Sequence, residues 1–251
     1  MHKLSVAIIT FNEESCIEAC LDSVAGVADE IIVLDSFSSD KTVQLANSKG
    51  AKVFQQKFAG YTQQKQDAVY LCGNDYILAL DADEQLSAEL LANIQSIKTN
   101  GFKEAAYLVN RLNFVGNRAV KTCGWYPDKK IRLWDRKKGA WGGQNPHDKV
   151  VMQHGIQAKQ LHGDLLHFTY PTLEDMIKQA DKFARVAANE LKHKNNFYLI
   201  LKLAFSAPIR FLKSYFIKRG FIDGKLGWLI CFHQTREVLL KYFLALKYKW
   251  S

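Results

Sequence analysis

Hydrophobic positions in the first hundred residues alternate between two periods. Short β-branched runs predict buried strands, and between them apolar residues such as Cys20, Leu21 and Val24 recur at helical spacing. We predict strands at residues 4–10, 30–34, 52–54, 76–80 and 105–111, and helices at residues 13–24, 41–49, 61–72 and 88–98. Strands joined by helices in this way imply right-handed βαβ units and a mostly parallel sheet.

Polar side chains follow three of these strands at the point where each strand ends. They are Thr10, Asn12 and Glu13 after the first strand, Asp35, Ser36 and Ser38 after the second, and Asp81 and Asp83 after the fourth. Open parallel sheets bind ligands beyond the carboxyl ends of their strands. We therefore expect the three clusters to form one site on one edge of the sheet.

The pattern changes after about residue 113. Aromatic residues, glycines and short β-type runs, at 130–134 and 150–152, dominate up to residue 166. An amphipathic helix is predicted at 173–194, entered through Pro171 and capped by Thr172. The rest of the chain is helical in pattern, so we divide the protein into residues 1–170 and a C-terminal helical extension, residues 171–251.

The net positive charge of the chain comes from its C-terminal end. Residues 192–251 contain 12 Lys or Arg and 2 Asp or Glu, whereas the other residues contain 22 and 23. A basic segment rich in aromatics can bind an anionic membrane or nucleic acid, and packed helices of a small subdomain are the alternative. We expect an anionic membrane surface and no nucleic acid, because the acidic strand edge would repel phosphate in the absence of a metal.

Cysteine usage and hydropathy suggest a location. The five cysteines have no CxxC spacing, which favours free thiols in a reducing compartment. The N-terminal apolar run is too short for a signal peptide, and no stretch approaches the roughly 20 apolar residues that span a bilayer. We expect a cytoplasmic protein, peripheral on the inner face of the cytoplasmic membrane.

The sequence Asp81-Ala82-Asp83-Glu84 places three acids directly after a buried strand. Clustered carboxylates repel one another, and a divalent cation relieves that repulsion. Mg²⁺ and Mn²⁺ prefer carboxylate oxygens and bridge them to substrate phosphates. The alternative is an acidic turn that favours the start of the next helix.

The other two clusters also have structural alternatives. Asn12 and Glu13 have the positions of helix-capping residues, and Ser38 or Asp40 can cap the next helix. Asp35 comes too early for that role, and a carboxylate there can accept hydrogen bonds from a base or a ribose.

These motifs together resemble family 2 of the inverting glycosyltransferases, which have the GT-A fold. The resemblance rests on AIITFNEE (7–14), VLDSFSSDKT (33–42) and DADE (81–84). Within the family, the chain is similar to the lipopolysaccharide core β-glucosyltransferase subgroup through FAGYTQQKQ (58–66), NPHD (145–148) and HFTY (167–170). The resemblance implies an α/β GT-A fold, Rossmann-like with helices on both sides of the sheet, with residues 1–100 as the nucleotide-sugar-binding half and 101–170 as the acceptor-side half.

The family implies roles for the matching positions. The residues that would bind the nucleotide sugar are Thr10, Asn12, Glu13, Asp35, Ser36, Lys65, Asp81 and Ala82. Asp83 would hold the divalent cation, Mg²⁺ or Mn²⁺, that bridges the diphosphate. The cation and Lys65 would neutralise the departing nucleoside diphosphate, on which negative charge grows in the transition state.

Inverting transfer needs a base that takes the proton of the acceptor hydroxyl. The candidate is Asp148, where the subgroup tends to have Glu, and Asp128 and Asp135 are weaker alternatives. A surface turn is the structural alternative for Asp148. His147 would orient the base or contact sugar, and His167 is expected to stabilise the turn before the next helix.

The acceptor side has further candidates. Trp125, Trp134 and Trp141 could stack on sugar rings, although aromatics at this density are mostly core. Arg132 could pair with a phosphate or acidic sugar of the acceptor, or be a solvated surface residue.

The sequence therefore predicts transfer of a hexose from a nucleoside-diphosphate sugar, with UDP-glucose favoured, to a glycolipid or oligosaccharide acceptor such as the lipopolysaccharide core. A nucleotide-sugar-binding module without catalysis would need the acidic strand edge but no base. A metal-dependent nucleotidyltransferase would release pyrophosphate instead of a nucleoside diphosphate.

Overall fold

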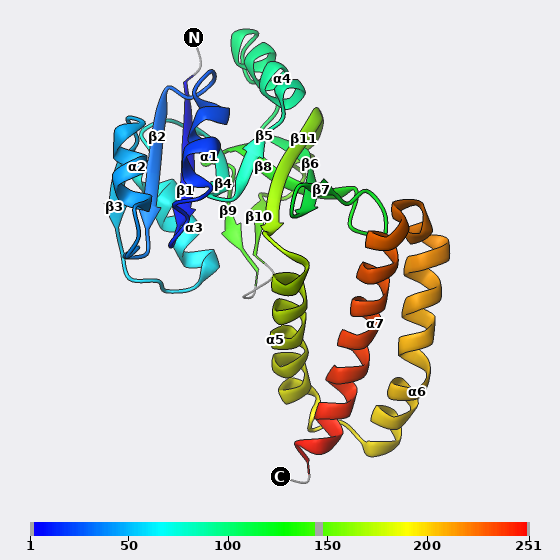
Figure 1. The fold of residues 1–251 in the computed structure, drawn as a ribbon. Coiled ribbons are helices and arrows are strands. Elements are labelled where there is room, and N and C mark those ends of the chain that lie inside the picture. The colour runs from blue at the N-terminus through cyan, green and yellow to red at the C-terminus, as the bar shows by residue number, and fades with distance from the viewer. Residues whose placement is uncertain (1–2, 144–147, 250–251) are drawn as a thin grey trace. The chain divides into compact units, whose positions relative to one another are not determined.

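Four parallel strands form the N-terminal half of the sheet, as the sequence pattern predicts. The computed structural model describes residues 3–143 and 148–249. The first elements in chain order are β1 (Leu4–Thr10), α1 (Ile17–Val24), β2 (Glu30–Asp35), α2 (Thr42–Ser48), β3 (Lys52–Gln55), α3 (Tyr61–Leu71) and β4 (Tyr76–Asp81). Strands β3, β2, β1 and β4 lie side by side and pair in parallel (Figure 1).

Antiparallel strands extend this sheet on the β4 side. They are β5 (Glu84–Leu86), β6 (Ala106–Val115), β7 (Arg118–Ala119), β8 (Asp128–Asp135) and β11 (Lys159–Tyr170). Within the described residues the sheet has nine strands in the order β3-β2-β1-β4-β8-β6-β11-β5, with β7 on β6. A separate ribbon pairs β9 (Gly139–Gly142) with β10 (Lys149–Met152). With helices on both faces of the parallel strands, the predicted α/β fold of the GT-A type is confirmed.

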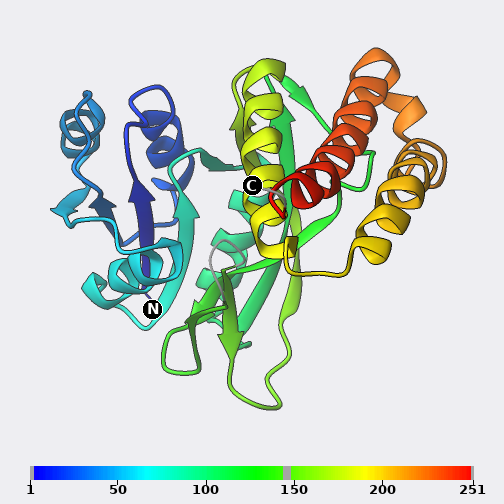
Figure 2. The same cartoon turned by 90° about the horizontal axis from the view of Figure 1, so that it is seen from below.

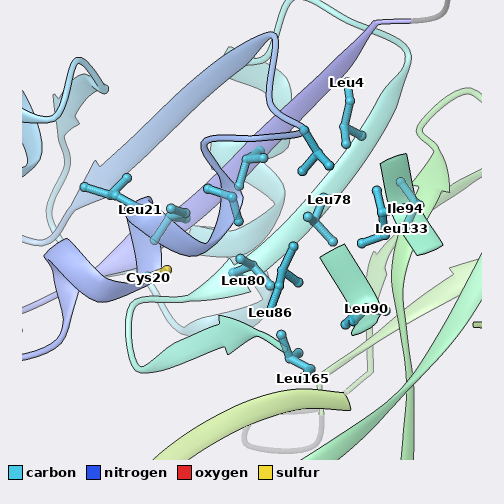
Figure 3. Packing of buried hydrophobic residues seen from close by; sticks show 14 of the residues in the cluster. Leu4, Cys20, Leu21, Leu78, Leu80, Leu86, Leu90, Ile94, Leu133 and Leu165 are labelled. Atoms are coloured by element: carbon cyan, nitrogen blue, oxygen red, sulfur yellow. The ribbon is translucent and has the colours of Figure 1, made fainter. Parts of the chain in front are cut away.

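Strand β1 shows how the sheet is held between two apolar layers. Leu4, Val6 and Ile8 point to one face, where they join a cluster with residues of α1 and of α4 (Ala88–Thr99). Figure 3 shows Leu4 in this cluster with Leu21 of α1 and Leu90 of α4. Ala7 points to the other face, toward a cluster that includes residues of α3. This alternation is the period of a strand buried on both sides, and it leaves polar positions only where the strand ends.

The chain forms two compact units. The first comprises Met1–Arg111 and Asp128–His167, and the second Leu112–Pro127 and Phe168–Ser251. The division predicted at residue 170, and the assignment of residues 1–100 to the nucleotide sugar and 101–170 to the acceptor, remain predictions.

Helices dominate the second unit (Figure 2). They are α5 (Leu173–Leu191), α6 (Asn196–Leu212), a π-helical turn η1 (Lys213–Ile217), a 3₁₀ turn η2 (Gly220–Asp223) and α7 (Gly224–Lys247). Thr172 caps α5 as predicted, because its side chain accepts a hydrogen bond from Asp175 N. Helix α7 packs against both α5 and α6. Nowhere in residues 3–143 and 148–249 do we find a helix with the length and hydrophobicity that a bilayer crossing requires.

Strand β11 is the main element that the sequence pattern did not predict. It reaches Tyr170, so His167 lies in a strand and not in the turn expected before α5. Gly163 lets β11 pass close to the start of α4: its φ is +88°, and a Cβ there would come within 2.3 Å of Leu90 N. Asp164 N then donates a 3.0 Å hydrogen bond to the capping residue Ser87.

Candidate active site

The carboxyl ends of β1, β2 and β4 meet in register. Thr10 is paired with Asp35, and Ile9 with Asp81. The three polar clusters that follow these strands therefore share one edge of the sheet, as the sequence predicts.

Asn12 links the first two clusters. Its backbone has φ +55°, a left-handed conformation that asparagine tolerates better than most residues. Its Oδ1 accepts a 2.8 Å hydrogen bond from Ser39 N, and its own N donates to Ser38 Oγ at 2.8 Å. Asn12 thus joins the loop after β1 to the loop after β2, and it does not cap α1.

Asp35 is fully buried and holds the loop after β2. Its Oδ2 accepts hydrogen bonds from Ser38 N at 2.9 Å and Gln55 Nε2 at 3.0 Å, and its Oδ1 accepts from Ser38 Oγ. Ser36 N donates to Thr10 O at 2.9 Å. Between them, Phe37 is exposed and has φ +63°, an uncommon conformation for a bulky side chain and a frequent mark of a functional loop.

Lys65 connects the candidate base to the third cluster. The Lys65 Nζ of helix α3 lies 2.8 Å from Asp148 Oδ2 and 3.0 Å from Asp81 Oδ1. Its side chain is 8% exposed, so both ion pairs are shielded from water. Asp148, which directly precedes β10, therefore lies at the same sheet edge as Asp81.

Asp81 is charged and already neutralised within the protein. Burial alone would raise the pKa of this carboxyl, but Lys65 and Arg132 outweigh burial and hold the pKa well below its usual range. Arg132 Nη2 lies 3.3 Å from Asp81 Oδ2 and 2.5 Å from Glu84 Oε1. Arg132 is buried, and although burial opposes its charge, Glu84 and Asp81 raise its pKa.

Arg132 and Glu84 thus form a buried support for Asp81. Glu84 is 0% exposed, and its Oε2 accepts a 3.0 Å hydrogen bond from Asp81 N. The sequence suggested an acceptor-side role for Arg132. The structure places its guanidinium against Asp81 and Glu84, and its role toward an acceptor stays a prediction.

Asp83 faces His167. The pairing of β5 with β11 sets His167 opposite Glu84, and His167 Nε2 lies 3.2 Å from Asp83 Oδ2. Ala82, between the two aspartates, is buried in the apolar cluster around β1. Sequence reasoning missed this use of His167 because β11 was not predicted.

Glu13 adds a further carboxyl group to this edge. Burial and the charges of Asp83, Asp40 and Asp81 raise its pKa to about 7. The backbone N of Glu13 donates to Thr42 Oγ1 at 2.8 Å, which fixes its position. Such mutual repulsion of carboxylates is what a bound cation relieves.

Two of the three tryptophans predicted to stack on sugar, Trp134 and Trp141, are buried, and Trp125 is half-buried. Trp134 is 0% exposed and packs edge-on against Trp141, with ring centroids 5.9 Å apart. Trp141 is 8% exposed, and its ring lies 4.9 Å from Lys65 Nζ. His147 lies outside the described residues.

The alternative bases have other partners. Asp128 forms an ion pair with Arg111, with a closest distance of 2.7 Å. Asp135 is paired with Tyr76, the first residue of β4, so it lies at the opposite edge of the sheet from Asp81.

Several buried polar atoms on the elements that carry this site have no hydrogen-bond partner among the described residues. They are Thr10 Oγ1, Thr62 Oγ1, Gln64 Oε1 and Nε2, Arg132 Nε and Trp141 Nε1. Gln64 is 0% exposed and directly precedes Lys65 on α3. Because buried polar groups are nearly always paired, this concentration indicates that a polar ligand or ordered water completes the site.

Comparison with known proteins identifies the family. The model of glycosyl transferase family 2 matches residues 5–155. A glycosyltransferase of Rickettsia typhi is 33% identical over 239 residues, which cover 91% of this chain and 82% of the relative. A lipopolysaccharide core biosynthesis glycosyltransferase of Rhizobium meliloti is 26% identical over 254 residues, or 96% and 93% of the two chains.

A solved structure has a more limited similarity. Glucosyl-3-phosphoglycerate synthase from Mycobacterium tuberculosis, in complex with Mn²⁺, UDP and glucosyl-3-phosphoglycerate, is 25% identical with a TM-score of 0.38. The match covers 45% of this chain and 44% of the synthase, too little to carry an inference about ligands. The family model and the full-length relatives are sufficient, however: the chain belongs to glycosyl transferase family 2 and is an enzyme that transfers sugars.

Proposed function

We propose that this enzyme transfers a hexose, with inversion, from a nucleoside-diphosphate sugar to a saccharide of a cell-surface glycolipid. UDP-glucose is the favoured donor and the lipopolysaccharide core the favoured acceptor. The observation that carries the proposal is the meeting of Lys65, Asp81 and Asp148 on the sheet edge, where Lys65 contacts both carboxylates. The relative from Rhizobium meliloti, whose name refers to the lipopolysaccharide core, supports the class of acceptor.

The donor lies along the ends of β1, β2 and β4 in this proposal. The nucleoside faces the loops of Asn12 and Asp35, and the diphosphate faces Lys65 and the Asp81–Asp83 turn. Unpaired buried atoms, above all both polar atoms of Gln64, supply hydrogen-bonding groups for it. A diphosphate is an anion, and the neighbouring acids require that it arrives with a cation.

Asp83 and His167 fit a divalent cation. Two ligand atoms held at about 2.1 Å from one ion and at right angles are about 3 Å apart, close to the 3.2 Å between Asp83 Oδ2 and His167 Nε2. An imidazole ligand favours a transition metal such as Mn²⁺ over Mg²⁺. Among the described residues no cluster of three or more His, Cys, Asp or Glu side chains has metal-binding geometry, so donor phosphates and water would complete the coordination. When bound, the cation would neutralise charge on the leaving diphosphate.

Asp148 is the general base of this proposal. Its carboxylate takes the proton from the acceptor hydroxyl as that oxygen attacks the anomeric carbon, and the nucleoside diphosphate leaves from the opposite face. Lys65 connects the two events. A diphosphate competes with Asp148 for the Lys65 ammonium, so donor binding releases Asp148 Oδ2 from its 2.8 Å ion pair.

A glycolipid acceptor also places the enzyme at a membrane. We propose a peripheral location on the cytoplasmic face of the inner membrane, where nucleotide sugars are available. Arg132, Trp141 and His147 remain the candidates for the acceptor side.

Product analysis tests the reaction. The enzyme is incubated with Mn²⁺, extracted lipopolysaccharide and UDP-glucose that is labelled in the sugar. We expect UDP and a labelled glycolipid in equal amounts, with an anomeric configuration opposite to that of the donor. Release of pyrophosphate would show a nucleotidyltransferase, and stoichiometric donor binding without turnover over a panel of acceptors would show a binding module.

A further inference from the structure

Helix α6 and the turn η1 present a row of large apolar side chains to solvent. Their exposed fractions run from 46% to 75%: Phe197 75%, Leu201 46%, Phe205 58%, Ile209 59%, Leu212 54% and Phe216 56%. The residues are three or four positions apart, so they form one stripe along the helix. We refer to these six residues as the α6 stripe.

The opposite face of α6 is already used for packing. Leu199 and Leu203 join a cluster with residues of α7 such as Ala245, and Ala207 is also buried. Helix α6 is therefore apolar on both faces, although only one is covered within the second unit. A helix that is hydrophobic all round normally has a partner on each side.

Positive charge accompanies the stripe and negative charge is absent from it. Neither α6 nor η1 contains Asp or Glu. Lys202 and Lys213 lie three helical turns apart along one edge of the stripe, and Lys218 and Arg219 follow at its end, both exposed. The nearby Asp223 accepts a hydrogen bond from Thr122 Oγ1.

The same chemistry continues into the start of α7. Ile217, Phe221 and Ile222 of the connecting turns are at least half exposed, and Lys225 is exposed beside them. Trp228 and Phe232 of α7 stack with ring centroids 5.3 Å apart and are each 44% exposed. Exposed aromatic side chains close to basic ones in the chain are typical of segments that bind the membrane interface.

We propose that the α6 stripe docks on the surface of an anionic membrane, with α6 lying in the plane of the headgroups. The apolar side chains enter the boundary of the acyl chains, and the Lys and Arg side chains reach lipid phosphates. A second copy of this chain fits less well, because two stripes face to face would bring two basic edges together without an acid to pair them. This docking surface rests on the proposed function, in which the enzyme lies at the membrane of its glycolipid acceptor, and it names the residues that would contact that membrane.

Vesicle binding tests this surface without any sugar transfer, so it can fail separately from the proposed reaction. The full chain is floated with phosphatidylcholine vesicles that contain or lack phosphatidylglycerol. We expect binding to the anionic vesicles that weakens with added salt. The double variant Phe205→Ser with Ile209→Ser is expected to bind at least roughly tenfold more weakly. Lys202→Gln with Lys213→Gln is expected to reduce the preference for phosphatidylglycerol without abolishing it, because Lys218, Arg219 and Lys225 remain.

Matched controls separate docking from folding and from dimer formation. Tyr70→Ser removes a 71% exposed aromatic on α3, and Lys103→Gln removes an exposed lysine before β6. Both are expected to bind vesicles like the unmodified chain, and all variants to keep its thermal transition. Equal vesicle binding by the serine double variant would overturn the proposal. So would a dimer that this variant dissociates, combined with no binding of the unmodified chain to vesicles.

Discussion

The ammonium of Lys65 lies 2.8 Å from Asp148 Oδ2 and 3.0 Å from Asp81 Oδ1, so one buried cation joins the candidate base to the acidic turn after β4. In the proposed reaction the same cation must also meet the donor diphosphate. Asp148 then competes with the donor diphosphate for the Lys65 ammonium before it acts as a base. This relationship separates donor binding from catalysis in a way that substitutions can measure.

Replacing Asp148 by Asn should lower turnover without weakening donor binding. Loss of a general base typically costs about 10²-fold to 10⁴-fold in kcat. The dissociation constant of UDP-glucose should stay the same or fall, because Lys65 loses a competing carboxylate. Calorimetric titration and initial rates check both numbers. Asp75→Asn, at the opposite end of β4 and 49% exposed, is the control, and a donor affinity that falls together with kcat would contradict the competition.

Replacing Gln64 by Leu should stabilise the free protein and weaken its binding of the donor. Both polar atoms of Gln64 are buried and unpaired within the described part of the chain, and removal of such a group recovers about 1 to 3 kcal/mol. Donor affinity should fall about fivefold to tenfold, since roughly 1 kcal/mol of hydrogen bonding is lost. Thermal melts with and without UDP-glucose measure both effects. The neighbouring Gln63→Leu, which is exposed, should change neither, and a less stable Gln64→Leu variant with normal donor affinity would assign Gln64 to the core alone.

Gly163 should tolerate no side chain. Alanine there meets both the strain of φ +88° and the backbone of Leu90, whereas Gly155 has φ +82° with open space around it. We expect Gly163→Ala to lower the free energy of unfolding by at least about 2 kcal/mol, and Gly155→Ala by about 1 kcal/mol. Denaturant titration measures the difference. Gly163→Ala should also weaken cation binding, because β11 carries His167. Equal losses for the two variants would show that β11 can move away from α4.

Glu13 should make both the stability of the protein and its binding of a cation depend on pH. Its pKa of about 7 in the folded protein lies above the ordinary value of 4.5, so the folded state holds a proton that the unfolded chain releases. The free energy of unfolding should therefore fall as pH rises from about 5 to about 7, by on the order of 1 kcal/mol after allowance for partial exposure.

A cation displaces this proton, so stabilisation by Mn²⁺ should grow over the same range. Melting temperatures at several pH values, with and without Mn²⁺, test the dependence. Glu13→Gln should flatten it, and Glu18→Gln on the exposed side of α1 should not. An unchanged slope in Glu13→Gln would assign the titration to another group.

The sequence was most informative where one local signal was enough. A run of apolar residues is enough to predict a strand such as Leu4–Thr10. Because parallel strands end on one edge of a sheet, the sequence also predicts correctly that Thr10, Asp35 and Asp81 lie close together. Long-range pairings were not readable in this way. The position of His167 depends on the pairing of β11 with β5, which lies about 80 residues earlier in the chain. The placement of Arg132 depends on its hydrogen bond to Glu84, which is also distant in the sequence. Neither contact leaves a periodic signal in the chain.

Calorimetric titration of UDP-glucose into the enzyme with Mn²⁺, compared with the same titration in EDTA and with the Asp83→Asn variant in Mn²⁺, tests the proposed donor site itself. We expect binding that requires Mn²⁺ and that falls by at least about tenfold in Asp83→Asn. Equal affinity in all three titrations, or no binding of UDP-glucose or of any other nucleotide sugar, would contradict a cation-assisted nucleotide-sugar site at the ends of β1, β2 and β4.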